Sequence, residues 1–331
     1  MAHLFSPRVS SWLTAWCRVP VAASMGAAPL GREWRTKIGL ALLGVSLGAA
    51  APSPDVHQPP GKLYDTADAR LHLYCLGQGS PTIVLEAGLG GNHMDWTFVQ
   101  PRLAEHNRVC SYDRAGAGFS DKASRPRTLE NLDKDLESLL ASAGVDGPLV
   151  LVGHSFGGVL AATFAARHRD RVVGLVLVDS MHPREFESFA AAGAPLPSNP
   201  YQVLNRTPAA AAAYGLPDGM QRLAIELASA DKARLSVIRE MRGIGASLTE
   251  ADRSGYVRIP ARVLVHGDDE WNELYPDGRM ERVWRGLQAD LARRLGAPAP
   301  EIVPHAGHQI PLDAPGAVVK AVNEVLQDTR R

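Results

Sequence analysis

Short runs of apolar residues recur along the chain, and longer stretches of mixed polarity separate them. Apolar runs of this length indicate strands that are covered on both faces, as in a parallel sheet. They predict strands at Leu71–Leu76, Thr82–Glu86, Val109–Tyr112, Leu149–Val152, Val172–Val178, Arg262–His266 and Glu301–Val303.

The stretches between these strands show helical periodicity. The clearest spans 128–143, where one apolar stripe is formed by Leu129, Leu132, Leu136, Leu139 and Leu140. Thr128 can cap the start of this helix, and Gly144 ends it. Further helices are predicted at Val159–His168 and Ala317–Leu326. Alternating strands and helices predict an α/β fold with a mainly parallel sheet.

The alternation stops between the strands that end at Val178 and begin at Arg262. Pro183–Tyr256 contains no clear strand, but helical patterns lie at Met220–Ala230 and Ala233–Met241. An insertion of this kind is expected to form a helical cap over the strand ends, where it excludes water and shapes a substrate pocket. We therefore divide the chain into an N-terminal segment (1–60), a first part of the core (61–182), the cap (183–257) and a second part of the core (258–331).

The N-terminal segment resembles a secretory signal more than a folded element. Ile38–Ala51 is free of charge, and Arg32, Arg35 and Lys37 precede it. It is shorter than the roughly 20 apolar residues that a membrane span requires, so no stable span is expected. Met25 would be a natural start for such a signal. If the signal is used, the protein is exported to the periplasm or secreted. Otherwise it is cytoplasmic or membrane-anchored.

Composition excludes some partners and points to one crosslink. The chain has 331 residues and a formal net charge of zero, so no nucleic-acid partner is expected. Cys75 and Cys110 lie in predicted strands, and Cys17 precedes the signal-like stretch. In an exported protein the pair Cys75 and Cys110 favours a disulfide, whereas two buried thiols are the alternative. The sequence carries no signal for the oligomeric state.

One segment combines a strand, a tight turn and a helix around a serine. After the strand Leu149–Val152, residues 153–157 read Gly-His-Ser-Phe-Gly, and a helical run follows. This arrangement predicts a nucleophile elbow with Ser155 as the attacking group, flanked by glycines where a β-carbon would clash. The backbone N–H of Phe156 is then one oxyanion donor, and the second should come from the loop after Thr82–Glu86.

A loop near the C-terminus supplies a candidate base. Pro304–Pro311 contains His305 and His308, after the last strand and before the last helix. His308 is preferred because Ala306 and Gly307 place it on a flexible turn, from which it can reach Ser155. Proline and glycine prevent the helix that would align the two histidines on a metal, so neither a metal nor a cofactor is expected.

Four motifs in this order resemble the α/β-hydrolase fold family over about residues 60–328. They are residues 86–91 (Glu-Ala-Gly-Leu-Gly-Gly), 112–120 (Tyr-Asp-Arg-Ala-Gly-Ala-Gly-Phe-Ser), 153–157 and 306–308 (Ala-Gly-His). The resemblance implies a mostly parallel eight-stranded sheet with helices on both faces and a helical cap insertion. It implies Ser155 as nucleophile, His308 as base and the N–H of Leu89 as second oxyanion donor, with Gly88 as the alternative.

The acid that orients His308 has two candidate positions. The family places it most often after the strand Arg262–His266 in a Gly-x-x-Asp pattern, which here ends in Glu270 and has Asp268 and Asp269 just before it. Some members use the preceding strand instead, and this position is occupied by Asp179.

These residues together predict a serine hydrolase that cleaves a small-molecule ester, thioester or amide through an acyl-enzyme on Ser155. The resemblance implies that epoxide hydrolases and haloalkane dehalogenases of this fold use aspartate as nucleophile, so Ser155 argues against both. A carbon–carbon hydrolase or an acyltransferase would keep the same triad. The non-enzymatic alternative is a protein of the same fold that binds a small ligand under the cap.

Overall fold

The computed structural model describes residues 59–193, 215–271 and 275–331. The predicted signal at Ile38–Ala51, Met25 and Cys17 therefore lie outside the described residues. Among the described helices, none is both long and apolar enough to cross a membrane.

An eight-stranded sheet forms the centre of the protein, in the order β1-β2-β4-β3-β5-β6-β7-β8. All seven predicted strands are confirmed, with ends that differ by two residues at most. β1 and β4 each pair antiparallel with β2, and all other neighbours are parallel. The strands are β1 (Lys62–Asp65), β2 (Arg70–Leu76), β3 (Thr82–Glu86), β4 (Val109–Tyr112), β5 (Leu149–His154), β6 (Val172–Val178), β7 (Ala261–His266) and β8 (Glu301–Val303).

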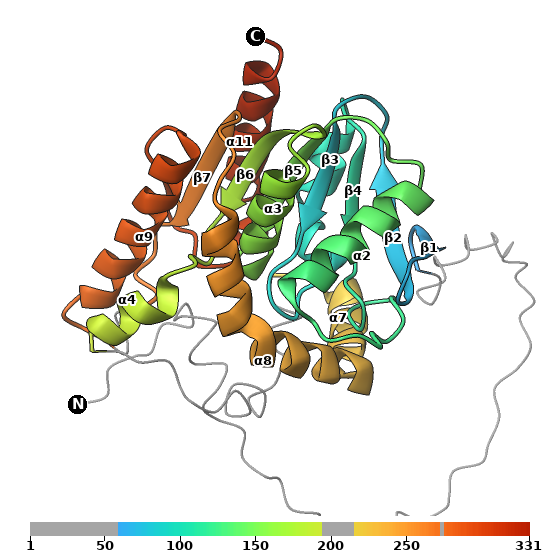
Figure 1. Cartoon of the computed structure of the whole chain (residues 1–331), viewed down its shortest axis with the longest axis horizontal. Helices are drawn as coiled ribbons and strands as arrows, with labels where there is room; N and C mark the ends of the chain where they lie inside the picture. The colour runs from blue at the N-terminus through green and yellow to red at the C-terminus, as the bar shows by residue number, and fades with distance from the viewer. Residues whose placement is uncertain (1–58, 194–214, 272–274) are drawn as a thin grey trace, which may run out of the picture.

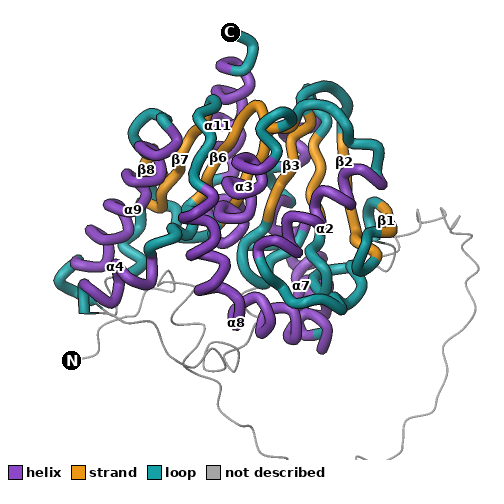
Figure 2. Tube along the Cα trace, in the orientation of Figure 1, coloured by secondary structure: helices purple, strands orange, loops and turns teal. Residues whose placement is uncertain are grey.

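Helices cover both faces of this sheet (Figures 1 and 2). On one face, α2 (Leu129–Ser142), α3 (Phe156–Arg167) and α9 (Arg279–Leu295) contribute to the same hydrophobic core. On the other face, a second core contains residues of α1 (Gln100–Ala104) and α11 (Pro315–Asp328). The short helices η1 (His93–Trp96) and α10 (Ile310–Asp313) lie in connections. The predicted fold class is confirmed.

Three described helices lie between β6 and β7, within the predicted cap. They are α4 (Glu185–Ala191), α7 (Asp218–Ser229) and α8 (Asp231–Ser254). α7 and α8 run along one end of the sheet in Figure 1, and α8 packs against α2 and α3. The loops after β3 and β4 contact α8 closely. At Gly116, for example, a β-carbon would lie 2.6 Å from the Ser236 β-carbon. The boundaries 183 and 257 remain a prediction.

The helix predicted at Ala233–Met241 is much longer in the structure. α8 continues to Ser254 through Gly243 and Gly245, two residues that normally weaken a helix. At Gly243 the absence of a side chain has a packing role, since a β-carbon there would lie 3.1 Å from the Arg127 carbonyl oxygen. The glycine therefore permits close contact with the core and does not end the helix.

The predicted disulfide between Cys75 and Cys110 is present. The two residues are direct partners in the antiparallel register of β2 and β4. The crosslink therefore fastens the antiparallel edge of the sheet to its parallel part.

Candidate active site

Ser155 lies in a strained turn between β5 and α3. Its backbone has φ 55° and ψ −124°, a conformation that non-glycine residues rarely adopt and that is typical of a nucleophile elbow. The flanking glycines leave room for this turn. A β-carbon on Gly153 would lie 2.6 Å from the Gly158 α-carbon, and one on Gly157 would lie 2.5 Å from the Ala87 carbonyl oxygen. The sequence motif thus describes a turn in which larger residues would clash.

His308 lies in the loop between β8 and α10, where hydrogen bonds hold it. Its Nδ1–H donates to Asp179 Oδ2 at 2.6 Å, and its backbone N–H donates to Glu270 Oε1 at 2.9 Å. Its carbonyl oxygen accepts from His154 Nε2 at 2.8 Å. Burial lowers the pKa of His154 to about 3, so this histidine is neutral and donates with the nitrogen that faces His308. Because His154 precedes Ser155 in the chain, the contact brings the His308 loop to the elbow.

Asp179 follows β6 and is the carboxylate that contacts the His308 ring. It is fully buried, yet its oxygens also accept from Trp284 Nε1 at 2.8 Å and from His266 Nδ1 at 2.8 Å. Burial by itself would raise the pKa of Asp179, but the charges and hydrogen bonds of His266 and His308 hold it well below its usual range. The Ser155 backbone N–H donates to the carbonyl of Val178, so the elbow and Asp179 lie on adjacent strand ends.

The other candidate acids occupy different positions. Glu270 accepts the backbone N–H of His308 with Oε1, whereas Asp179 meets the His308 ring. Burial raises the pKa of Glu270. Asp268 and Asp269 are exposed at the turn after β7, and Asp269 pairs with Arg285 at 3.4 Å. Of the four carboxylates named from the sequence, Asp179 therefore has the geometry of the triad acid.

The loop after β3, called the oxyanion loop for its predicted role, is held by Arg114. Its guanidinium donates to the carbonyls of Ala87 at 2.6 Å and Gly88 at 2.7 Å. In a trans peptide the N–H points away from the preceding C=O, so the Leu89 N–H points away from Arg114. Gly88 lies beside Ser155, since a β-carbon there would be 3.2 Å from the Ser155 β-carbon. The N–H of Phe156 belongs to the first turn of α3, where backbone donors lack helical partners.

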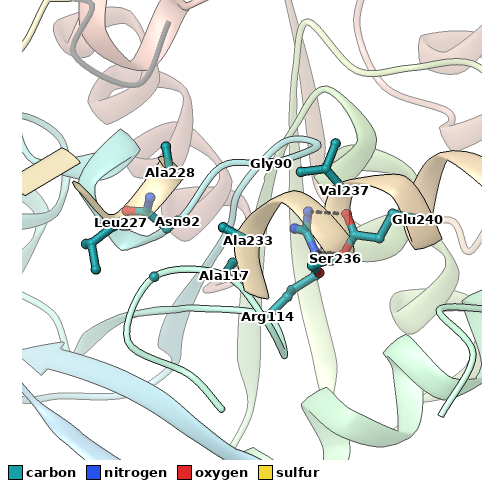
Figure 3. Close-up of a pocket in the computed structure, with 11 residues that line it drawn as sticks. Gly90, Asn92, Arg114, Ala117, Leu227, Ala228, Ala233, Ser236, Val237 and Glu240 are labelled. Carbon is teal, nitrogen blue, oxygen red and sulfur yellow. Dashed lines mark hydrogen bonds and ion pairs between the residues drawn. The ribbon is translucent and has the colours of Figure 1, made fainter. Parts of the chain in front are cut away.

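Arg114 also links this loop to α8 through a buried network of charges. It pairs with Glu86 at 2.7 Å and with Glu240 of α8 at 2.9 Å, and the Tyr112 hydroxyl donates to Glu86. Burial raises the pKa of Glu86, while Arg114 opposes the rise. Figure 3 shows Arg114 reaching Glu240 beside a small hollow that Ser236 and other residues of α8 line. Neither Ser155 nor His308 lines this hollow.

Among the residues that the structure describes, two groups of histidine and aspartate bring possible metal-ligand atoms within 4.8 Å of one another. In the first, Asp113 accepts from His72 Nδ1 at 2.9 Å and from the backbone and ring of His93 at 2.8 and 2.9 Å. The second contains Asp179, His266 and His308. In both groups the ring nitrogens are engaged in hydrogen bonds to the carboxylate, a pattern that needs no ion to explain it. The expectation of a metal-free protein remains a prediction.

Three residues near Asp179 were not predicted as part of the site: His266, Glu281 and Trp284. His266 ends β7, and the other two lie on α9. One signal was available: a histidine that ends an apolar strand of a parallel sheet lies at the same edge as the elbow. The two residues of α9 give no comparable signal, because they reach Asp179 only through the fold.

Comparison with known proteins identifies the family. The sequence profile of the Alpha/beta hydrolase family matches residues 83–321. Epoxide hydrolase 3 of Xenopus tropicalis is 35% identical over 36% of this chain and 33% of its own, and an uncharacterized protein of Schizosaccharomyces pombe is 36% identical over 37% of this chain and 28% of its own. The chain therefore spans about a third of the length of these relatives. A thermophilic esterase from Thermogutta terrifontis superposes with a TM-score of 0.58 and 23% identity, covering 82% of this chain and 99% of the esterase. The profile covers most of the chain, and the chain belongs to the alpha/beta hydrolase family.

Proposed function

We propose that this protein is a serine hydrolase that cleaves a small-molecule ester, thioester or amide through an acyl-enzyme on Ser155. The observation that carries the proposal is the 2.6 Å hydrogen bond from His308 Nδ1 to Asp179, next to the strained turn at Ser155. With Nδ1 as donor, the lone pair of neutral His308 lies on Nε2, the atom that takes the proton from the attacking hydroxyl.

Attack by Ser155 on the substrate carbonyl forms a tetrahedral intermediate with a negatively charged oxygen. The N–H groups of Phe156 and Leu89 would donate to this oxygen, and each such donor contributes about 3 kcal/mol to transition-state stabilisation. Arg114 supports the second donor by fixing the carbonyl of Gly88 on the opposite side of the same peptide. His308 then protonates the leaving group and activates a water that releases the acid.

A fluorophosphonate probe tests the nucleophile directly. We expect the probe to label the protein at Ser155 and Ser155→Ala to abolish labelling. Ser229→Ala removes an exposed hydroxyl at the end of α7 and should leave labelling unchanged. If folded protein is not labelled, or if labelling survives Ser155→Ala, the proposal is wrong.

Two further variants separate the candidate acids. Asp179→Asn should lower kcat by about 10⁴, because the amide favours the wrong tautomer of His308. Glu270→Gln retains an oxygen that can accept the His308 backbone N–H, so its effect should be far smaller. The opposite ranking of the two variants would make Glu270 the triad acid.

A further inference from the structure

His266 lies between two buried carboxylates behind the triad. It is 1% exposed, and its Nδ1 lies 2.8 Å from Asp179 Oδ2. Its Nε2 lies 3.3 Å from both carboxylate oxygens of Glu281 on α9. The imidazole stacks on Trp284 at an angle of 23°, which fixes the ring between its two partners.

This arrangement requires a proton on both ring nitrogens. An ionised carboxylate only accepts hydrogen bonds, so each nitrogen of His266 must donate. Glu281 also accepts from the Trp271 backbone N–H at 3.2 Å and lies 3.8 Å from Arg285. Burial would lower the pKa of His266, but the charge and hydrogen bond of Asp179, together with Glu281, raise it to about 10.

We propose that His266 and Glu281 are positioning residues that together set the charge felt by the His308 base, and with it the pH range of the reaction. Asp179 Oδ2 binds both His308 and His266. Without the charge of Glu281, the positive charge of His266 would cancel the negative charge of Asp179. Glu281 offsets that cation, so the group behind His308 keeps one net negative charge. This inference rests on the proposed function.

Other charged or titratable groups face the same site from several elements. Glu270 of the loop after β7 contacts the His308 backbone, and Asp313 of α10 accepts from the Gly307 N–H at 3.0 Å. His154 ends β5, Glu185 of α4 interacts with Asp179, and Arg285 of α9 lies beside Glu281. None of these groups changes in the variants below, so a difference between the variants reports on the pair.

The test compares the pH dependence of kcat/KM in single and double variants. Glu281→Gln leaves His266 uncompensated, so protonated His308 is disfavoured. The acid limb of the profile should therefore shift to lower pH, by on the order of one pH unit. The double variant His266→Gln/Glu281→Gln again leaves one net negative charge, and its acid limb should return close to that of the wild type. Asp277→Asn, an equal charge change at an exposed position before α9, should not shift the limb.

A lack of shift in Glu281→Gln, or a double variant that shifts further the same way, would overturn the inference. A purely structural role for Glu281 would not be reversed by a second buried substitution.

An independent measurement separates this inference from the proposed function. Nitrogen NMR of the histidine side chains in Ser155→Ala protein at about pH 8 should show an imidazolium that His266→Gln removes. If no such signal exists in folded protein, the inference is wrong even when the enzyme is active. If the signal is present but the fluorophosphonate probe fails to label the wild type, the proposed function is wrong and the buried charge pair remains.

Discussion

Glu185 provides a quantitative test of how burial controls charge near the site. It lies in the first turn of α4, is 6% exposed, and accepts from the His182 backbone N–H at a long 3.3 Å. Burial and, to a smaller extent, the charge of Asp179 raise its pKa from 4.5 to about 8. The carboxyl is therefore mostly neutral in the folded protein at pH 7, whereas it is ionised in the unfolded chain.

The difference in pKa makes the free energy of unfolding depend on pH. Folding takes up a proton between pH 4.5 and about 8, so the stability from this group is fully present below 4.5 and is lost as pH rises through that window. The loss is about 1.4 kcal/mol per pH unit, or about 3 kcal/mol by pH 7 as an upper limit. Glu185→Gln keeps an oxygen that can accept from His182 and takes up no proton. Its stability relative to the wild type should therefore rise steadily with pH.

Urea denaturation at several pH values between about 5.5 and 8 measures this slope. Glu187→Gln is the matched control, because Glu187 lies on the same helix with its side chain 71% exposed. The control should differ from the wild type by an amount that does not change with pH. If the advantage of Glu185→Gln is equally independent of pH, Glu185 is ionised in the folded protein and the reasoning from burial fails.

Three further predictions concern the supports of the site. Glu240→Gln leaves Arg114 without one buried charged partner, so it should lower the free energy of unfolding in urea by about 3 kcal/mol. Glu250→Gln, at an exposed ion pair on the same helix, is the control and should change the free energy of unfolding by less than about 0.5 kcal/mol. Gly153→Ala forces a β-carbon to within 2.6 Å of the α3 backbone, so the variant should lose fluorophosphonate labelling or fail to fold, as circular dichroism will distinguish. Reduction of the disulfide, which closes a separation of 35 residues, should lower the free energy of unfolding by about 4 kcal/mol in the chain-entropy estimate, measured with and without a phosphine reductant.

Local sequence patterns predicted the sheet well and the helices less well. The seven strands predicted from apolar runs are present, and most of them are buried along their length, although the edge strand β8 exposes Ile302. β1 was missed because Lys62–Asp65 is a largely exposed edge strand without an apolar run. α9 was not predicted, although its buried residues Met280, Trp284, Leu287 and Leu291 have helical spacing.

Some residues of the site can be predicted from nearby sequence, whereas others depend on how distant segments fold together. Ser155 and His308 lie in short glycine-containing motifs, so the sequence alone could name them as candidates. The acid could not be chosen from the sequence, because Asp179 and Glu270 both contact His308 and differ only in whether they meet its ring or its backbone. That difference depends on how the ends of β6 and β7 are placed relative to the loop after β8.

Two buried pairs support opposite sides of the proposed reaction, and they should be separable by experiment. Arg114 and Glu240 hold the oxyanion loop against α8, whereas His266 and Glu281 hold Asp179 against α9. Weakening the first pair should slow phosphonylation of Ser155 at every pH, since the donors to the developing charge lose their support. Weakening the second pair should move the pH profile and leave the maximal rate of phosphonylation nearly unchanged. If Glu240→Gln instead shifts the profile as Glu281→Gln does, the two helices act on one common electrostatic network, and the division between the oxyanion side and the acid side is wrong.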